Sequence, residues 1–250
     1  MKFLPKLNLN FSFSFKKILG RFFLFIAGLL LGAFLFMPWE VAWSQVFKIA
    51  DAKISKATIQ WGDFISAGPL SFEVSNVHVT TQNGIVITIP QLGFDVGISP
   101  LVEVRVKTGP TLTARLFQAK SLTLGGGVDL GKLVRMDGLG GKVRITSDVG
   151  FPAWGKPPHT GSLVLRADQV EIPGGLIAED VNVNAVLAGN QFQLNSFSCG
   201  QPIPVSAKGA ATLNWGNLAS STYQISGSTT LGSTERQFSK SGNLSKYLSF

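Results

Sequence analysis

The chain has 250 residues, of which 45% are hydrophobic and 14% charged, and it contains 28 glycines. A chain of this length can bury a substantial core, and frequent Gly, Val, Ile, Thr and Ser favour short strands joined by turns over helical bundles. The single cysteine, Cys199, excludes an intramolecular disulfide and a cysteine metal site. The composition therefore predicts a mainly β protein.

The net charge of +8 is concentrated at the N-terminus, where no acidic residue precedes Glu40. Nucleic-acid binders cluster Lys and Arg on one surface, whereas the cations after residue 40 are scattered along the chain. We therefore expect no nucleic-acid partner, and membrane topology explains the basicity better. Five of the positive charges belong to the N-terminal segment: Lys2, Lys6, Lys16, Lys17 and Arg21.

An apolar run follows this basic segment, and its only charge is Arg21, close to its start. The run reads ILGRFFLFIAGLLLGAFLFM over residues 18–37, and as a helix it would span roughly 30 Å, the thickness of a bilayer core. We predict a basic cytoplasmic segment over 1–17 and a transmembrane helix over 18–37, with Arg21 reaching the headgroups. In a bacterium this single-pass protein would lie in the inner membrane with its body in the periplasm.

The apolar run and the residues just after it leave two questions open: whether the segment is cleaved and whether it associates with a second copy. Ala42-Trp43-Ser44 weakly resembles a signal-peptide cleavage site, although the uncharged stretch before it is long for a signal peptide, so a retained anchor is favoured. Gly28 and Gly32 have the spacing that lets two membrane helices pack closely and would allow a homo-oligomer. Glycine is also common in membrane helices that do not associate.

A short amphipathic helix is predicted over residues 38–52, at the exit from the membrane. Trp39, Trp43, Val46 and Ala50 recur there at helical spacing. The two tryptophans fit an aromatic belt at the membrane interface. In the alternative interpretation both simply enter the core of the body.

From residue 53 to 250 the apolar period changes to two, which is typical of strands with one dry face. Asn83-Gly84 and Gly189-Asn190 are the best two-residue hairpin turns. The sequence predicts an extended, twisted antiparallel β-sheet or β-groove. A Pro-rich stretch over 150–161 either divides two β lobes or forms a loop on one continuous sheet. The alternation is clearest in two segments, one with Ile85, Ile87 and Ile89 and the other with Val181 and Val183.

No residue pattern in the chain predicts chemistry. His78 and His159 are isolated from any ligand or nucleophile pattern, and the carboxylates are scattered apart from Glu179-Asp180. We expect a non-enzymatic protein without a catalytic, cofactor or metal site.

The order of these features resembles type II secretion system protein N. The similarity is one of arrangement: a basic N-terminus, one apolar helix, a Pro-Trp exit, the segment ISKATIQWGDFISAGPLSFEVSNVHVTT over Ile54 to Thr81, and then repeated β segments. It covers most of the chain. The resemblance implies a non-catalytic accessory or scaffold of the type II secretion machinery in the inner membrane, whose partners are other secretion or envelope proteins.

The same arrangement is also similar to AsmA-like proteins, whose anchored β-grooves are associated with lipid movement. That resemblance implies phospholipid as a ligand. A lipid groove needs the dry face open, so that Ile85, Ile87, Ile89, Val181 and Val183 meet acyl chains, whereas a scaffold closes the same face into a core. Alternation predicts one apolar face in both cases, so the sequence leaves the choice open.

Overall fold

The structure is a computed structural model that describes residues 15–54, 57–81, 84–97, 101–135, 138–153, 155–172, 174–232 and 234–246. The chain divides into two compact units, Met1–Trp39 and Glu40–Phe250. Most of the predicted basic segment 1–17 lies outside the described residues. Each unit is considered by itself below.

The first unit consists of helix α1 (Phe15–Phe36), which includes most of the apolar run. At its end the indole Nε1 of Trp39 donates a hydrogen bond to the Phe34 carbonyl at 3.1 Å. A Cβ added at Gly28 or Gly32 would meet no atom within 4 Å, so the α1 surface is open at both glycines. The side chain of Arg21 lies outside the described residues. In the described part of the chain, no helix combines the length and the hydropathy that crossing a membrane requires.

The second unit begins with helix α2 (Trp39–Lys53), where the sequence predicts a helix over 38–52. Glu40 in its first turn and Lys53 in its last turn both suit the helix dipole. One side of α2 carries Trp43 and Phe47, which contact the sheet. Val46, on another side, is 49% exposed.

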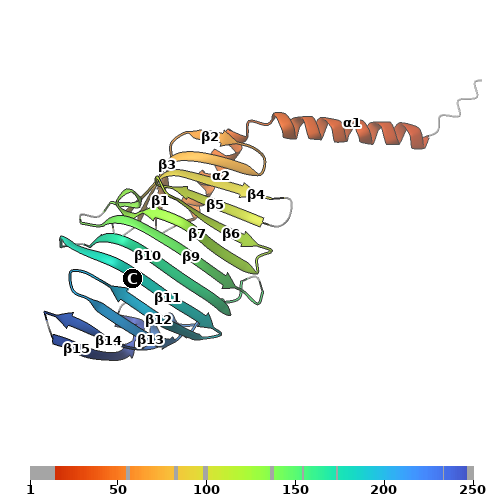
Figure 1. The fold of residues 1–250 in the computed structure, drawn as a ribbon. Coiled ribbons are helices and arrows are strands. Elements are labelled where there is room, and N and C mark those ends of the chain that lie inside the picture. The colour runs from red at the N-terminus through yellow and green to blue at the C-terminus, as the bar shows by residue number, and fades with distance from the viewer. Residues whose placement is uncertain are drawn as a thin grey trace, which may run out of the picture. The chain divides into compact units, whose positions relative to one another are not determined.

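All fifteen strands of the second unit belong to one antiparallel sheet (Figure 1). Thirteen strands form its path in the order β1-β3-β4-β5-β6-β7-β9-β10-β11-β12-β13-β14-β15, while β2 pairs with β3 and β8 pairs with β4. The strands are β1 (Ala57–Gln60), β2 (Phe64–Ala67), β3 (Ser71–Thr81), β4 (Val86–Val96), β5 (Leu101–Lys107), β6 (Thr111–Phe117), β7 (Ser121–Asp129), β8 (Val134–Arg135), β9 (Gly140–Gly150), β10 (Thr160–Ile172), β11 (Leu176–Ala188), β12 (Gln191–Cys199), β13 (Val205–Thr212), β14 (Thr222–Leu231) and β15 (Thr234–Asn243).

This topology confirms the predicted mainly β fold with an antiparallel sheet, and the sheet is open. Gly189 and Asn190 join β11 to β12, and Gly189 has a φ of 63°, a left-handed value that favours glycine. Asn83 of the other predicted turn, Asn83-Gly84, lies outside the described residues, and Gly84 has a φ of 78°. Gly150 pairs directly with Thr160, so β9 and β10 are neighbours in one continuous sheet, and residues 151–159 of the Pro-rich stretch connect them.

Short elements complete the unit. Helix α3 (Leu130–Leu133) follows β7 and leads into β8, which pairs with β4 through Val86 and Ile87. Two 3-10 turns, η1 (Leu218–Ser220) and η2 (Leu244–Lys246), flank the last two strands. The polypeptide between β7 and β9 therefore reaches back to β4 before it returns to the sheet.

Candidate functional site: an open apolar sheet face

Strand pairing separates the side chains of the sheet onto two faces, because residues directly opposite in an antiparallel pair point to the same side. The apolar face can be followed from strand to strand, as Leu163 lies opposite Ala185, Ala185 opposite Leu194, and Leu194 opposite Gly209. The large side chains of this face include Phe72, Val74, Val77, Ile87, Ile89, Leu92, Phe94, Val102, Val104, Val106, Leu112, Leu116, Leu122, Leu124, Ile145, Leu163, Leu165, Val181, Val183, Leu187, Phe192, Leu194, Phe197 and Ile225.

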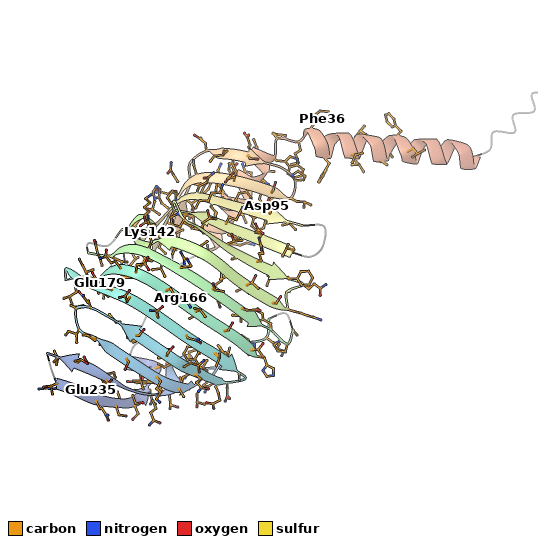
Figure 2. The ribbon with its side chains drawn as sticks, in the orientation of Figure 1. Phe36, Asp95, Lys142, Arg166, Glu179 and Glu235 are labelled. Carbon is orange, nitrogen blue, oxygen red and sulfur yellow. The ribbon has the colours of Figure 1, made fainter. Side chains whose placement is uncertain are left out.

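The opposite face is polar and carries the ion pairs that the described residues form. Glu103 accepts a hydrogen bond from Arg115 Nε at 2.7 Å and lies 3.6 Å from Arg105. Arg105 also pairs with Asp95, and Lys107 pairs with Glu73. Figure 2 labels five residues of this polar face, on strands from β4 to β15: Asp95, Lys142, Arg166, Glu179 and Glu235.

At its N-terminal end the apolar face is covered by α2. Phe72 is 7% exposed and lies between Phe94, stacked at 5.1 Å, and Trp43, whose ring centre is 4.8 Å away. The Trp43 indole Nε1 donates a hydrogen bond of 2.8 Å to the Gly68 carbonyl. The Asp51 carboxylate accepts one of 2.7 Å from the Ile59 amide. These contacts place Trp43 in the core of the second unit, whereas Trp39 contacts the end of α1.

A second, smaller covered patch lies where α3 packs on the sheet. Val128, Val143 and Ala167 are buried there, with Leu130 and Leu133 of α3 against them. The Thr108 hydroxyl, nearby at the β5–β6 turn, accepts a hydrogen bond from the Asp129 amide at 2.9 Å. This cover extends over only a few strands.

Beyond this patch no α-helix among the described residues packs over the apolar face. After Val143, every buried apolar residue in the described part of the chain is an alanine: Ala167, Ala178, Ala185 and Ala207. Alanine is shielded by its larger neighbours, whereas a leucine or phenylalanine is fully buried only when another element packs over it. Large residues here, such as Leu163, Phe192 and Leu194, are only half-buried. The face from β10 to β14 is therefore an apolar surface in contact with solvent.

A hollow of 400 Å³ lies on this open surface across β12, β13 and β14. The hollow forms because the side chains of β13 on the apolar face are small: Ala207, Gly209 and Ala211. Larger residues of β12 and β14 flank Gly209 and Ala211. Such a volume lies within the range of small-ligand sites. We call it the β13 hollow, and it is lined mainly by Phe192, Leu194, Gly209, Ala211, Leu213, Tyr223, Ile225 and Leu244.

A second hollow, of 850 Å³, lies on the same face at the ends of β6 and β7. Leu116 and Leu122 of these strands line it together with Phe151 and Trp215. Trp215 belongs to the connection between β13 and β14, and β13 is the fifth strand along from β7. In a flat sheet five strand spacings amount to about 24 Å. Trp215 thus lies beside residues of β6 and β7, although its loop follows a strand five places further along the sheet path.

The predicted groove residues lie on one face but not in one site. Ile89 packs against the cluster under α2, and Val181 packs against the α3 patch. Ile87 and Val183 share this face, while Ile85 precedes β4 and is 38% exposed. The sequence analysis missed the β13 hollow. The signal in the sequence that could have indicated it is the run of small residues at every second position of β13, Ala207, Gly209 and Ala211.

The isolated residues considered for chemistry have ordinary partners. His78 Nδ1 lies 3.0 Å from the Thr88 hydroxyl, and the Cys199 thiol donates to the Gln201 carbonyl at 3.0 Å. His159 lies in the exposed loop between β9 and β10, where its amide donates to the Gly150 carbonyl. Within the described ranges, no three His, Cys, Asp or Glu side chains gather as metal ligands.

We compared the chain with protein-family models, with curated proteins and with solved structures, and no family model, curated protein or solved structure matches it.

Proposed function

We propose that this protein binds lipid acyl chains along its apolar sheet face, the role implied by the resemblance to AsmA-like proteins. The observation that carries the proposal is the uncovered surface from β10 to β14, where alanines are the only buried apolar residues among those described. Exposed apolar surface of this extent is unfavourable in water and marks an interaction site. From β10 to β14 this surface extends across four strand spacings, about 19 Å in a flat sheet.

The chemistry of the face favours an acyl chain over a polypeptide. The backbone amides and carbonyls of β10–β14 are engaged in ladders within the sheet plane, so the face offers apolar side chains and few hydrogen-bonding groups. A peptide lying on this face would bury its own N–H and C=O groups without partners, which is costly. An acyl chain has no such groups and gains from every methylene it buries.

The supply of lipid is explained by membrane anchoring, which we propose from the sequence. Residues 18–37 would cross the inner membrane of a bacterium, with the N-terminus in the cytoplasm and the sheet in the periplasm. The apolar face, closed by α2 at one end and hollowed along β13, would then act as a groove beside the membrane.

Photocrosslinking in intact bacterial envelopes tests this function with matched positions. Leu194 lies on the apolar face and its neighbour Gln193 on the polar face of the same strand. A photoreactive residue at position 194 of the full chain should give phospholipid adducts, and one at 193 should not. Equal adducts at both positions, or no lipid adduct at 194, would contradict acyl-chain binding.

A second candidate function, scaffolding of the type II secretion machinery, is favoured by strand β15. This strand lies at the end of the sheet path, and its ten residues are all exposed. An edge strand can pair with a strand of a partner through main-chain hydrogen bonds. Photoreactive residues at Ser239 or Ser241 should then capture secretion proteins, and capture of no protein at either position would remove this candidate.

A further inference from the structure

We infer that the ligand is an anionic phospholipid, whose phosphate is bound by Arg236 and Lys240 beside the β13 hollow. This inference rests on the proposed acyl-chain binding and adds the headgroup class. On β15, the described residues Arg236 and Lys240 add positive charge to the far end of the apolar face.

Strand register places both cations on the apolar face. Lys240 lies directly opposite Ile225, and Arg236 directly opposite Thr229. Opposite residues in an antiparallel pair have Cβ atoms about 5 Å apart. Because Ile225 lines the β13 hollow, Lys240 lies directly opposite a residue of its lining.

The two cations stand out against an uncharged surface. On β11 to β14, the residues that point to the apolar face are all uncharged over the ranges 181–187, 192–199, 205–211 and 223–229. Lys208 lies within one of these ranges but on the polar face. None of the ion pairs formed by the described residues includes Arg236 or Lys240, and Glu235 is on the polar face. Both cations therefore lack a described carboxylate partner while they border an apolar hollow.

The groups around the cations suit a headgroup with chains attached. Arg236 and Lys240 are four residues apart, about 13 Å along the strand, and Phe238 lies between them on the same face. Phe238 lies against Gly227, where an added Cβ would come within 2.8 Å of its ring. The Thr229 hydroxyl opposite Arg236 is buried and has no hydrogen-bond partner within the described residues.

Charge and shape together specify an amphiphile. A phosphate forms charge-assisted hydrogen bonds with Arg and Lys, and Arg can bind it through two N–H groups. The acyl chains would continue from the phosphate into the β13 hollow across Ile225 and Leu194. A lipid with net negative charge satisfies both cations, whereas a zwitterionic headgroup brings its own cation to the same place.

The test uses the full chain in nonionic detergent, titrated with phosphatidylglycerol or phosphatidylcholine of identical acyl chains, with native mass spectrometry as the readout. We expect phosphatidylglycerol to bind about tenfold more tightly. The double variant Arg236→Gln/Lys240→Gln should reduce its affinity to that of phosphatidylcholine and leave phosphatidylcholine unchanged. The matched variant Arg166→Gln/Lys208→Gln removes the same charge from the polar face and should keep the preference.

The outcomes separate this inference from the proposed function. Equal affinity for the two lipids, or equal loss of preference in both double variants, would overturn the headgroup site while acyl-chain binding stands. No binding of either lipid would overturn acyl-chain binding itself. Glycerol phosphate tests whether the cations bind a free phosphate instead of a lipid headgroup. If glycerol phosphate displaced phosphatidylglycerol at equal concentration, the cations would be assigned to a soluble ligand. Circular dichroism of each variant establishes that the sheet is intact.

Discussion

The two ends of the sheet present the same sequence pattern and different surroundings. On β3, Phe72 alternates with polar residues and is 7% exposed. On β12, Phe192 alternates with glutamines in the same way and is only half-buried. The difference lies outside the strands, because α2 brings Trp43 and Phe47 onto the first end and no described helix covers the second. Alternation therefore specifies a dry face, and a separate element decides whether that face becomes a core.

The covering element also explains why the two ends should differ in function. An aromatic cluster that encloses Phe72 leaves no room for a ligand, and its contacts stabilise the fold. The small side chains of β13 do the reverse, since they deepen an uncovered surface. Stability and binding are thus assigned to different parts of one continuous face, and substitutions at matched positions can separate them.

The largest expected effect is the loss of Phe72. Phe72→Ala should lower the free energy of unfolding by about 3–5 kcal/mol, because it leaves a cavity among packed aromatic rings. Phe192→Ala should cost only about 1 kcal/mol, since that ring is only half-buried and no aromatic cluster encloses it. Thermal unfolding of the full-length variants, followed by circular dichroism, measures both. Equal destabilisation would mean that the two ends are equally covered.

A smaller loss of stability is expected when the hydrogen bond from Trp43 of α2 to the Gly68 carbonyl is removed. Trp43→Phe keeps an aromatic ring against Phe72 but leaves the Gly68 carbonyl without its indole donor. The loss should be about 1–2 kcal/mol. Trp39→Phe provides the control, because the Trp39 indole bonds within the first unit. If the control lowered the melting temperature of the sheet as much as Trp43→Phe, the assignment of Trp43 to the core would be wrong.

Sequence reasoning predicted the parts of this fold that depend on local geometry. Ile87 and Ile89 share a face because strand side chains repeat every two residues, and Gly189 forms a turn because it adopts a positive φ. It could not assign Trp43, whose hydrogen-bond partner Gly68 is 25 residues away. Nor could it find the β13 hollow, because the hollow depends on three strands being neighbours.

The polar faces of the two ends of the sheet also differ, and removing a charge from the first end should lower stability only modestly. Glu103 contacts Arg105 and Arg115 on β5 and β6, whereas no ion pair forms among the described residues of β10–β15. Glu103→Gln should cost about 0.5 kcal/mol, because the pairs are partly exposed and Glu103 also lies opposite Asp95. The difference from the unsubstituted protein should shrink in high salt. A difference that does not change with salt would show that packing, and not charge, stabilises this end.

The smallest expected effect on stability accompanies a large expected effect on binding. Ala211→Leu places a larger apolar side chain into the β13 hollow, where it gains contact with Phe192 and Tyr223 without displacing a packed neighbour. The free energy of unfolding should therefore change by less than about 0.5 kcal/mol, while lipid bound per protein in native mass spectrometry should fall severalfold. Ala210→Leu adds the same group to the polar face and should leave lipid binding unchanged. If Ala211→Leu destabilised the sheet strongly, the hollow would be a strained part of the core. If it left lipid binding intact, acyl chains would have to lie elsewhere on the apolar face, and the small residues of β13 would have no role in holding them.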